Sequence, residues 1–174
     1  MGARADLFHL EPLGKHHDRS GFHCGVESLD LYLKAQASQD MRRKANAVFV
    51  LTPFDLPSRI AGYFTLCAYV LAPGTIPEAA HKHIPRYPMV SATLLGRLAV
   101  SAEFQGHGLG SILLAKALAK AYENAAQVGS SKVVVDAIGD HAAKFYAAHG
   151  FIQLPESMRL ILPMQTIAAM IEPA

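Results

Sequence analysis

The chain has 174 residues, of which 51% are hydrophobic, and this length and composition suit one domain, 1–174, with a single core. Its 16 Lys and Arg against 14 Asp and Glu leave a formal net charge of only +2. No apolar run reaches the roughly 18 residues of a membrane span, and Met1–Asp6 has no apolar signal core. We therefore expect a cytoplasmic protein that does not engage membranes.

The first half of the chain predicts one helix followed by strands. Ser28 is expected to cap a helix over 27–43, because apolar residues recur there at helical spacing: Leu29, Leu33, Ala37 and Met41. A strand over 46–52, a turn over 53–57 and a long strand over 59–71 follow. A loop with four prolines then covers 73–88, with a short helix near 78–83.

The second half alternates strands with helices. The expected strands are 93–101, 132–138, 151–154 and 158–162, and the expected helices are 109–127, 140–148 and a tail from Met164. The apolar run Val133–Val135 indicates a strand buried on both faces. The whole pattern predicts an α/β fold with a mixed central β-sheet flanked by helices.

A glycine-rich stretch between the strand 93–101 and the helix 109–127 is the most informative local feature. Gln105 is followed by glycines at 106, 108 and 110, and then by Ser111. Backbone N–H groups of such a loop can point at one anion, and the helix N-terminus adds about half a positive charge. The spacing fits neither a dinucleotide fingerprint nor a P-loop, which ends in Gly-Lys-Ser/Thr. We expect a phosphate-bearing cofactor here.

The pattern Gln-x-x-Gly-x-Gly resembles the pyrophosphate loop of the GNAT acetyltransferase family. A second segment, Phe145-Tyr-Ala-Ala-His-Gly-Phe151, resembles the C-terminal half of the same fold, with Gly150 capping a helix. The resemblance implies acetyl-CoA as the acetyl donor. It also implies that Tyr146 protonates the departing thiolate. His141 stands where many of these enzymes carry an asparagine that contacts pantetheine.

The resemblance assigns the cofactor to the loop and to the end of the preceding strand. The pantetheine arm is expected to pair with that strand, and a backbone N–H there to bind the oxyanion. The predicted cofactor residues are Leu98, Ala99, Val100, Gln105, Gly106, His107, Gly108, Leu109, Gly110 and Ser111. No general base is evident; Asp136 and Glu103 are candidates by their place in the sequence alone.

Ordered segments along the chain narrow the resemblance further. Phe22-His-Cys-Gly-Val-Glu-Ser-Leu-Asp-Leu-Tyr-Leu33 and Leu95-Gly-Arg-Leu-Ala-Val100 are similar to GNAT-type toxins of type II toxin–antitoxin modules. Members of that group acetylate the α-amine of aminoacyl-tRNA and so block translation. The resemblance implies a ribbon-helix-helix antitoxin as partner and a homodimer.

Basic residues between 32 and 90 fit such an acceptor, because phosphate contacts dominate tRNA affinity. Arg42, Arg43, Lys44 and Arg86 are the predicted phosphate contacts. Arg97 is expected to face the cleft or to pair with an acid. Two alternatives stay open: a GNAT enzyme acting on a small amine or a protein N-terminus, and a binding module without turnover.

Cysteines and histidines do not indicate a metal site. Cys24 and Cys67 lack metal-ligand spacing and are expected to be buried free thiols. None of the nine histidines forms an H-x-x-x-H pair on an expected helix with an acidic third ligand, so no metal is predicted.

Overall fold

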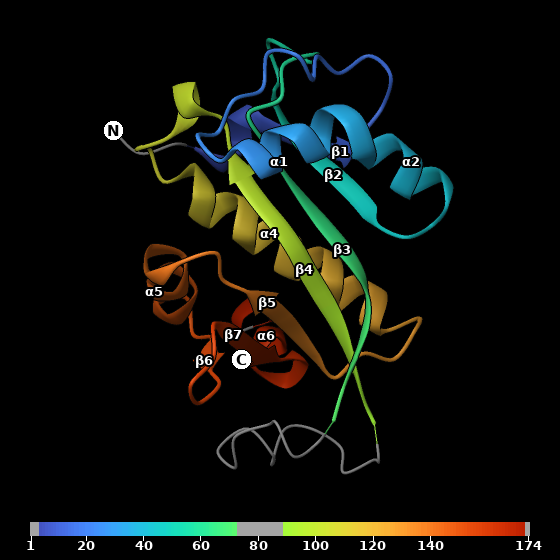
Figure 1. Cartoon of the computed structure of the whole chain (residues 1–174), viewed down its shortest axis with the longest axis vertical. Helices are drawn as coiled ribbons and strands as arrows, with labels where there is room; N and C mark the ends of the chain where they lie inside the picture. Colours follow the sequence, from blue (N-terminus) through green and yellow to red (C-terminus); the bar gives the residue numbers. More distant parts are fainter. Residues whose placement is uncertain (1–3, 73–88, 173–174) are drawn as a thin grey trace. The chain divides into compact units, whose positions relative to one another are not determined.

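The computed structural model describes residues 4–72 and 89–172. Within these ranges the strands form one mixed sheet in the order β1-β2-β3-β4-β5-β7-β6 (Figure 1). The pairs β1–β2, β2–β3, β5–β7 and β6–β7 are antiparallel, and β4 and β5 run parallel. The predicted α/β class with a mixed sheet and flanking helices is confirmed.

The strands of the sheet are β1 Phe8–Pro12, β2 Ala47–Pro53, β3 Gly62–Leu71, β4 Val90–Val100, β5 Lys132–Asp136, β6 Ile152–Gln153 and β7 Arg159–Pro163. The helices are α1 Glu27–Leu31, α2 Ala37–Arg42, α4 Leu109–Ala125, α5 Asp140–Ala148 and α6 Met164–Ile171. Short helical turns cover η1 Ala5–Leu7 and η4 Ala102–Phe104, and a π-helical turn, η2 Tyr32–Gln36, joins α1 to α2.

Two compact units divide the chain. The first comprises Met1–Cys67 and Arg97–Ala117, and the second comprises Ala68–Gly96 and Leu118–Ala174. Each unit is described by itself below.

The first unit has an aromatic-rich core beneath the helical segment 27–42. Leu33 and Ala37 are fully buried, and Leu29 and Met41 pack against the same cluster, so the predicted apolar stripe is confirmed. The Tyr63 hydroxyl donates to the Leu29 carbonyl at 2.7 Å and so ties α1 to β3.

The predicted N-cap is wrong. The residue before α1 is Val26, it makes no side-chain cap bond, and Ser28 lies inside the helix. Asp30 instead accepts the N–H of Cys24 at 2.9 Å and holds the chain that enters the helix.

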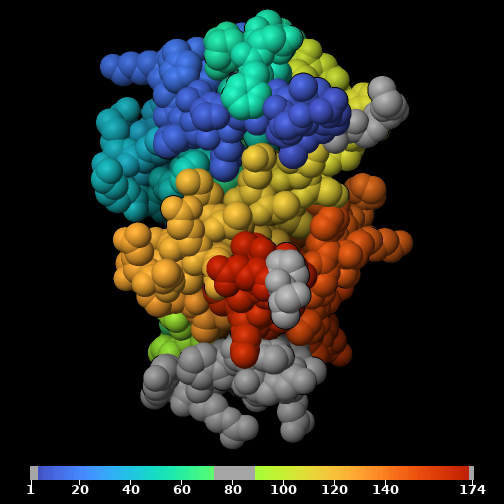
Figure 2. Space-filling view, turned by 180° about the vertical axis from the view of Figure 1, so that it is seen from behind, coloured from blue at the N-terminus to red at the C-terminus, as the bar shows by residue number. Residues whose placement is uncertain are grey.

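The second unit has an aliphatic core formed by Leu71, Val90, Ala92, Val134, Leu154 and Ile161. Val133–Val135 is buried as predicted. Helix α6 lies at the surface in Figure 2 (red), where Met170 and Ile171 are exposed. Along 4–72 and 89–172, no helix combines the length and apolarity needed to cross a bilayer.

Gly150 ends α5 as the sequence predicts. The φ of Gly150 is +94°. The N–H of Phe151 donates to the Tyr146 carbonyl, and the N–H of Gly150 donates to the Ala147 carbonyl. This bond pair defines a left-handed helix cap, which places Phe151 at the start of the next buried segment.

Candidate active site

The side chain of Gln105 holds the glycine loop in place within the first unit. Its Nε2 group donates to the carbonyls of Val100 and Cys24, both at 2.8 Å. The Ala102 N–H also donates to the His23 carbonyl at 2.7 Å. The loop is thus held to the end of β4 and to segment 23–24.

Two glycines shape the loop through their backbone conformation. Gly106 and Gly108 both have φ of +82°, which side chains rarely adopt, and a Cβ at either position would meet nothing within 4 Å. Alternating glycines of this kind turn successive N–H groups toward a common concavity. The glycines are therefore required by conformation rather than by crowding.

Helix α4 begins directly after this loop, at Leu109. The N–H groups in the first turn of a helix generally have no acceptor within that helix, and the helix dipole places positive potential at this end. Gln105–Gly108 and Ser111 are exposed, Gly110 is half-buried, and the Leu109 side chain is buried, so Leu109 can serve a ligand only through its backbone. A helix N-terminus preceded by such a loop is suited to bind a phosphate group, so the pyrophosphate site stays a prediction.

The end of β4 supplies the second predicted part of the cofactor site. The ladder between β4 and β5 pairs Thr93 and Leu94 with Val133 and Val134, and it extends no further along the described part of β4. The backbone edge at 98–100 therefore has polar groups with no β5 ladder partner in the described chain. An extended amide-bearing arm can pair with such an edge.

Gly62 on β3 fixes where this strand end lies. A Cβ added there would stand 3.0 Å from the Ala99 carbonyl oxygen and 3.0 Å from Cδ2 of Leu113. A side chain there would press on the backbone of β4 and displace it by a few tenths of an ångström, so close packing favours glycine at this position.

Neither candidate general base is available in the described structure. Glu103 accepts two bonds from Arg59, both at 2.6 Å, and Asp136 accepts two from Arg159 at 2.7 and 3.0 Å. Bidentate pairing of this kind occupies both carboxylate oxygens with charge-assisted hydrogen bonds. Both carboxylates are thus held by arginines.

Tyr146 lies in the second unit, on α5, and is 8% exposed. Its ring packs edge-on against Phe145 and Phe151. Burial raises the pKa of the hydroxyl to about 12. The group therefore stays protonated at neutral pH and is suited to donate a hydrogen bond to a developing anion.

The predicted phosphate contacts in the described chain gather at one helix end. Arg42 ends α2, and Arg43 and Lys44 follow it; all three are exposed. The fourth, Arg86, lies outside the described residues, as does the short helix expected near 78–83. Lys44, two residues after the helix end, has a left-handed backbone conformation with φ of +60°.

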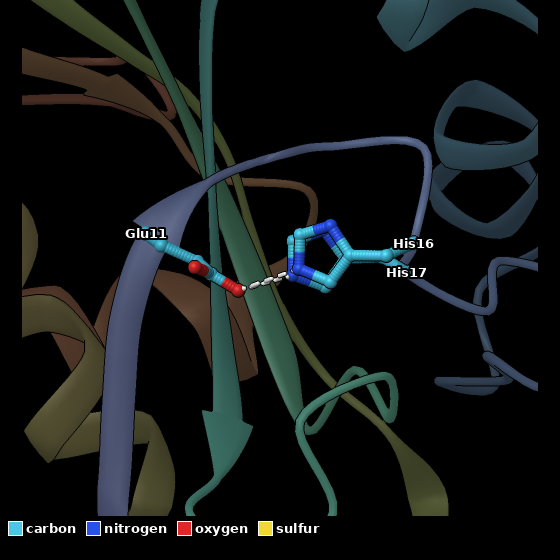
Figure 3. A group of neighbouring side chains, drawn as sticks. All are labelled: Glu11, His16 and His17. Atoms are coloured by element: carbon cyan, nitrogen blue, oxygen red, sulfur yellow. Dashed lines mark hydrogen bonds and ion pairs between the residues drawn. The ribbon is translucent and has the colours of Figure 1, made fainter.

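Glu11 and two adjacent histidines form a cluster that sequence reasoning missed (Figure 3). Nε2 of His17 lies 2.6 Å, and Nε2 of His16 3.1 Å, from the same Glu11 oxygen. The Gly14 N–H points at Nδ1 of His17 at 2.9 Å, which places the His17 proton on Nε2, facing Glu11. In that tautomer Nε2 is a donor and offers no lone pair to a metal. The cluster thus holds the turn after β1.

Sequence reasoning also missed the surroundings of Arg97. Its guanidinium lies 3.5 Å from the centroid of the Tyr32 ring, and no ion pair joins it to an acid within the described ranges. The two residues are 65 positions apart, and no local pattern signals the contact. Cys24 and Cys67 are free as predicted, although each is only partly buried.

A glycine loop at a helix N-terminus, beside an open strand edge, is suited to bind a phosphate-bearing, amide-containing cofactor. A profile of the acetyltransferase (GNAT) domain matches residues 66–153. The chain is 31% identical to a tRNA-acetylating toxin of Mycobacterium tuberculosis over 88% of this chain and 90% of that protein. It is 26% identical to a probable toxin TacT of Sinorhizobium fredii, over 92% and 93%. The chain belongs to the GNAT acetyltransferase family.

Solved structures agree with this assignment. A tyrosine-to-phenylalanine mutant of KacT superposes with a TM-score of 0.87 at 29% identity, covering 94% of this chain and 99% of that one. AtaT complexed with acetyl-methionyl-tRNAfMet gives 0.85 at 29% identity, with the same coverage. Both similarities extend over nearly the whole of each chain.

Proposed function

We propose that this chain is the toxin of a type II toxin–antitoxin system, which transfers acetyl from acetyl-CoA to the α-amine of aminoacyl-tRNA and blocks translation. The proposal treats residues 1–174 as one acetyltransferase domain acting in the cytoplasm. The observation that carries it is the similarity, over nine-tenths of both chains, to a tRNA-acetylating toxin. A structure of AtaT, a similar protein, holds acetyl-methionyl-tRNAfMet.

The site residues have distinct tasks in this proposal. The loop amides over 105–111 bind the pyrophosphate, and the backbone of Leu98, Ala99 and Val100 aligns the pantetheine arm. Acetyl-CoA supplies an activated thioester. A backbone N–H of the same strand stabilises the oxyanion. Tyr146 donates its proton toward the thiolate sulfur, the role that the family resemblance gives its position.

The absence of a free base among the described candidates fits an α-amine acceptor. Such an amine has a pKa of roughly 7.7–8.0 and is partly neutral at cell pH, whereas a lysine amine near 10.4 needs far more help. Arg42, Arg43, Lys44 and Arg86 are proposed to bind tRNA phosphates. No metal has a role in the proposed reaction.

The partners are part of the same proposal. Structures of similar proteins show AtaT with the C-terminus of the antitoxin AtaR, and a KacTA–DNA complex. We infer that a ribbon-helix-helix antitoxin neutralises this chain and that the active toxin is a homodimer.

The test is transfer of radiolabelled acetyl from acetyl-CoA to a charged total tRNA pool, with uncharged tRNA and Tyr146→Phe as controls. Label on charged tRNA alone, lost in the variant, supports the proposal. Label on an amine or peptide library and none on tRNA overturns it in favour of a small-amine or N-terminal acetyltransferase. No turnover on any acceptor favours a binding module.

A further inference from the structure

Arg97 differs from the other arginines whose contacts have been described. Arg59 and Arg159 are each held by a carboxylate, but no hydrogen bond or ion pair joins the Arg97 guanidinium to any residue of the described chain. One face of its plane covers the Tyr32 ring at 3.5 Å. Stacking leaves the edges of a guanidinium, which carry its N–H groups, open to another ligand.

Tyr32 is itself held firmly beneath Arg97. Its hydroxyl donates to Oδ2 of Asp40 at 2.8 Å, and its side chain is in the buried core of the first unit. Asp40 also accepts from Asn46 at 3.1 Å and from Gln36 at 3.0 Å. Because Asp40 is satisfied by these neutral donors, the Arg97 charge is not needed to balance it by direct contact.

The place of Arg97 on β4 brings it near the proposed chemistry. It directly precedes the 98–100 segment, and strands rise about 3.3 Å per residue, so its Cα is within roughly 10 Å of that whole segment. Side chains two apart on a strand share a face, which places Arg97 on the face of Ala99, and Ala99 belongs to the same core cluster as Tyr32. An acceptor delivered to a thioester lying along 98–100 therefore passes within reach of Arg97.

We propose that Arg97, positioned by Tyr32, binds the phosphodiester that joins the last two nucleotides of the acceptor. This inference rests on the proposed function. That phosphodiester is the phosphate closest to the aminoacyl ester, and a guanidinium edge matches two phosphate oxygens in one plane. Arg97 is then a specificity-determining residue for the acceptor, and Tyr32 is a positioning residue.

Arg42, Arg43 and Lys44 differ from Arg97 in this respect. They are exposed around a helix C-terminus and suit contacts with the tRNA backbone, where each phosphate contact is independent of the nucleotide sequence. Arg97 is half-buried and pre-oriented, which suits one defined phosphate. The first group is predicted to set affinity for tRNA, and Arg97 to place its terminal nucleotide.

The experiment compares two hydrolysis-stable acceptors that carry the same amino acid, chosen as the one that the enzyme labels best on total tRNA. One is amide-linked aminoacyl-adenosine, which lacks the phosphodiester. The other is the same unit extended to cytidylyl-adenosine, which contains it. We expect the wild-type chain to prefer the dinucleotide by roughly 10- to 100-fold in kcat/KM, the range of a charge-assisted contact.

Variants assign that preference to Arg97. Arg97→Gln should abolish the preference for the dinucleotide. Arg97→Lys should retain part of that preference, because lysine keeps the charge but cannot stack on Tyr32 or bind two phosphate oxygens as a planar guanidinium does. Tyr32→Phe keeps the ring but loses the Asp40 bond, and it should lower the preference without removing it. Arg4→Gln, which removes an exposed charge paired with Asp6, is the matched control and should change nothing.

Acetyl-CoA affinity, measured by calorimetry for every variant, separates this role from misfolding or a cofactor role. Unchanged affinity with lost preference supports the proposal. It is overturned if Arg97→Gln keeps the preference, or weakens acetyl-CoA binding as much as transfer. A wild-type chain that labels charged tRNA but shows no preference for the dinucleotide overturns the Arg97 assignment alone. One that labels no tRNA overturns the proposed function.

Discussion

Three polar side chains of the first compact unit differ in burial and bonding from two polar side chains of the second. In the first unit, Gln105 and Arg59 make direct hydrogen bonds near the surface, and Arg97 stacks on Tyr32 with no hydrogen bond from its guanidinium edges to the described residues. In the second unit, Tyr146 and Lys132 are buried, and burial raises the pKa of the tyrosine to about 12 and lowers the pKa of the lysine to about 8. Changes to these exposed polar side chains of the first unit should therefore alter binding, and changes to the buried Tyr146 or Lys132 should alter proton transfer or stability.

Tyr146→Phe tests the second half of this comparison at its most sensitive point. The substitution keeps the ring contacts with Phe145 and Phe151 and removes only the proton donor. We expect turnover to fall by about 100-fold or more with acetyl-CoA affinity unchanged, as measured by steady-state kinetics and calorimetry. Tyr122→Phe, which alters an exposed bond to Glu172, is the control.

The pH profile adds an independent check on this tyrosine. Because its pKa is about 12, Tyr146 stays protonated across the usable range, and wild-type turnover should show no fall between about pH 8 and 10. Full turnover in the variant would remove Tyr146 from the reaction. A basic limb near pH 9 in the wild-type chain would instead point to a different acid.

Replacing Arg42 and Arg43 together with alanine tests the first half of the comparison. We expect transfer to charged tRNA to fall by roughly 10- to 100-fold, with acetyl-CoA binding unchanged. The slope of log affinity against log salt should become shallower by about 1.5, since two phosphate contacts are lost. Alanine at the exposed Arg4 and Lys15 removes the same charge elsewhere. Equal losses from both pairs would mean that only net charge matters.

Gly62→Ala tests whether a change in the first unit that removes no polar group can also alter binding. It changes no polar group, yet its Cβ would strike the Ala99 carbonyl at 3.0 Å and displace the strand end that we assign to the cofactor arm. We expect about 1–3 kcal/mol of lost unfolding free energy in chemical denaturation and weaker acetyl-CoA binding. Gly129→Ala, where a Cβ meets nothing within 4 Å, is the control. Wild-type cofactor affinity in Gly62→Ala would separate this strand end from the cofactor site.

Local sequence signals predicted much of this molecule. The glycine loop, the helix cap at Gly150 and the buried run over 133–135 each depend on a few adjacent residues with one favoured conformation. The π-helical turn at 32–36 could not be predicted, because the apolar residues of this segment recur at the spacing of a regular α-helix. Strand β1 was missed because its five residues include His9, Glu11 and Pro12, and it forms by pairing with β2.

Pairings between distant residues could not be predicted. Glu103 and Asp136 looked like free carboxylates because Arg59 and Arg159 lie 44 and 23 residues away from them. Arg97 was expected to face the cleft or pair with an acid, and its stacking on Tyr32 follows from how β4 packs on the helical segment. Site residues defined by backbone conformation were thus predictable, and those defined by side-chain partners were not.

Lys132→Met has the smallest expected effect and tests stability in the second unit. Within residues 4–72 and 89–172, the buried Lys132 donates to the Ser91 carbonyl and the Ser131 hydroxyl alone, each at 3.3 Å. Burial lowers its pKa from 10.5 to about 8. Below pH 8 both folded and unfolded chains are protonated, so the folded chain bears the full cost of a buried charge. Between pH 8 and 10.5 the folded chain loses its proton first, and the unfolding free energy rises.

Denaturant titrations of the wild-type and Lys132→Met chains at pH 7 and pH 9 isolate this contribution. The wild-type chain should gain about 1 kcal/mol relative to the variant between these two values. Taking the difference cancels Cys24, whose pKa burial raises to about 11 in both chains. Lys116→Met, a half-exposed lysine on α4, should keep the wild-type pH response. An unchanged response in Lys132→Met would show that water or motion solvates the ammonium group, and the contrast between the two units would then rest on Tyr146 alone.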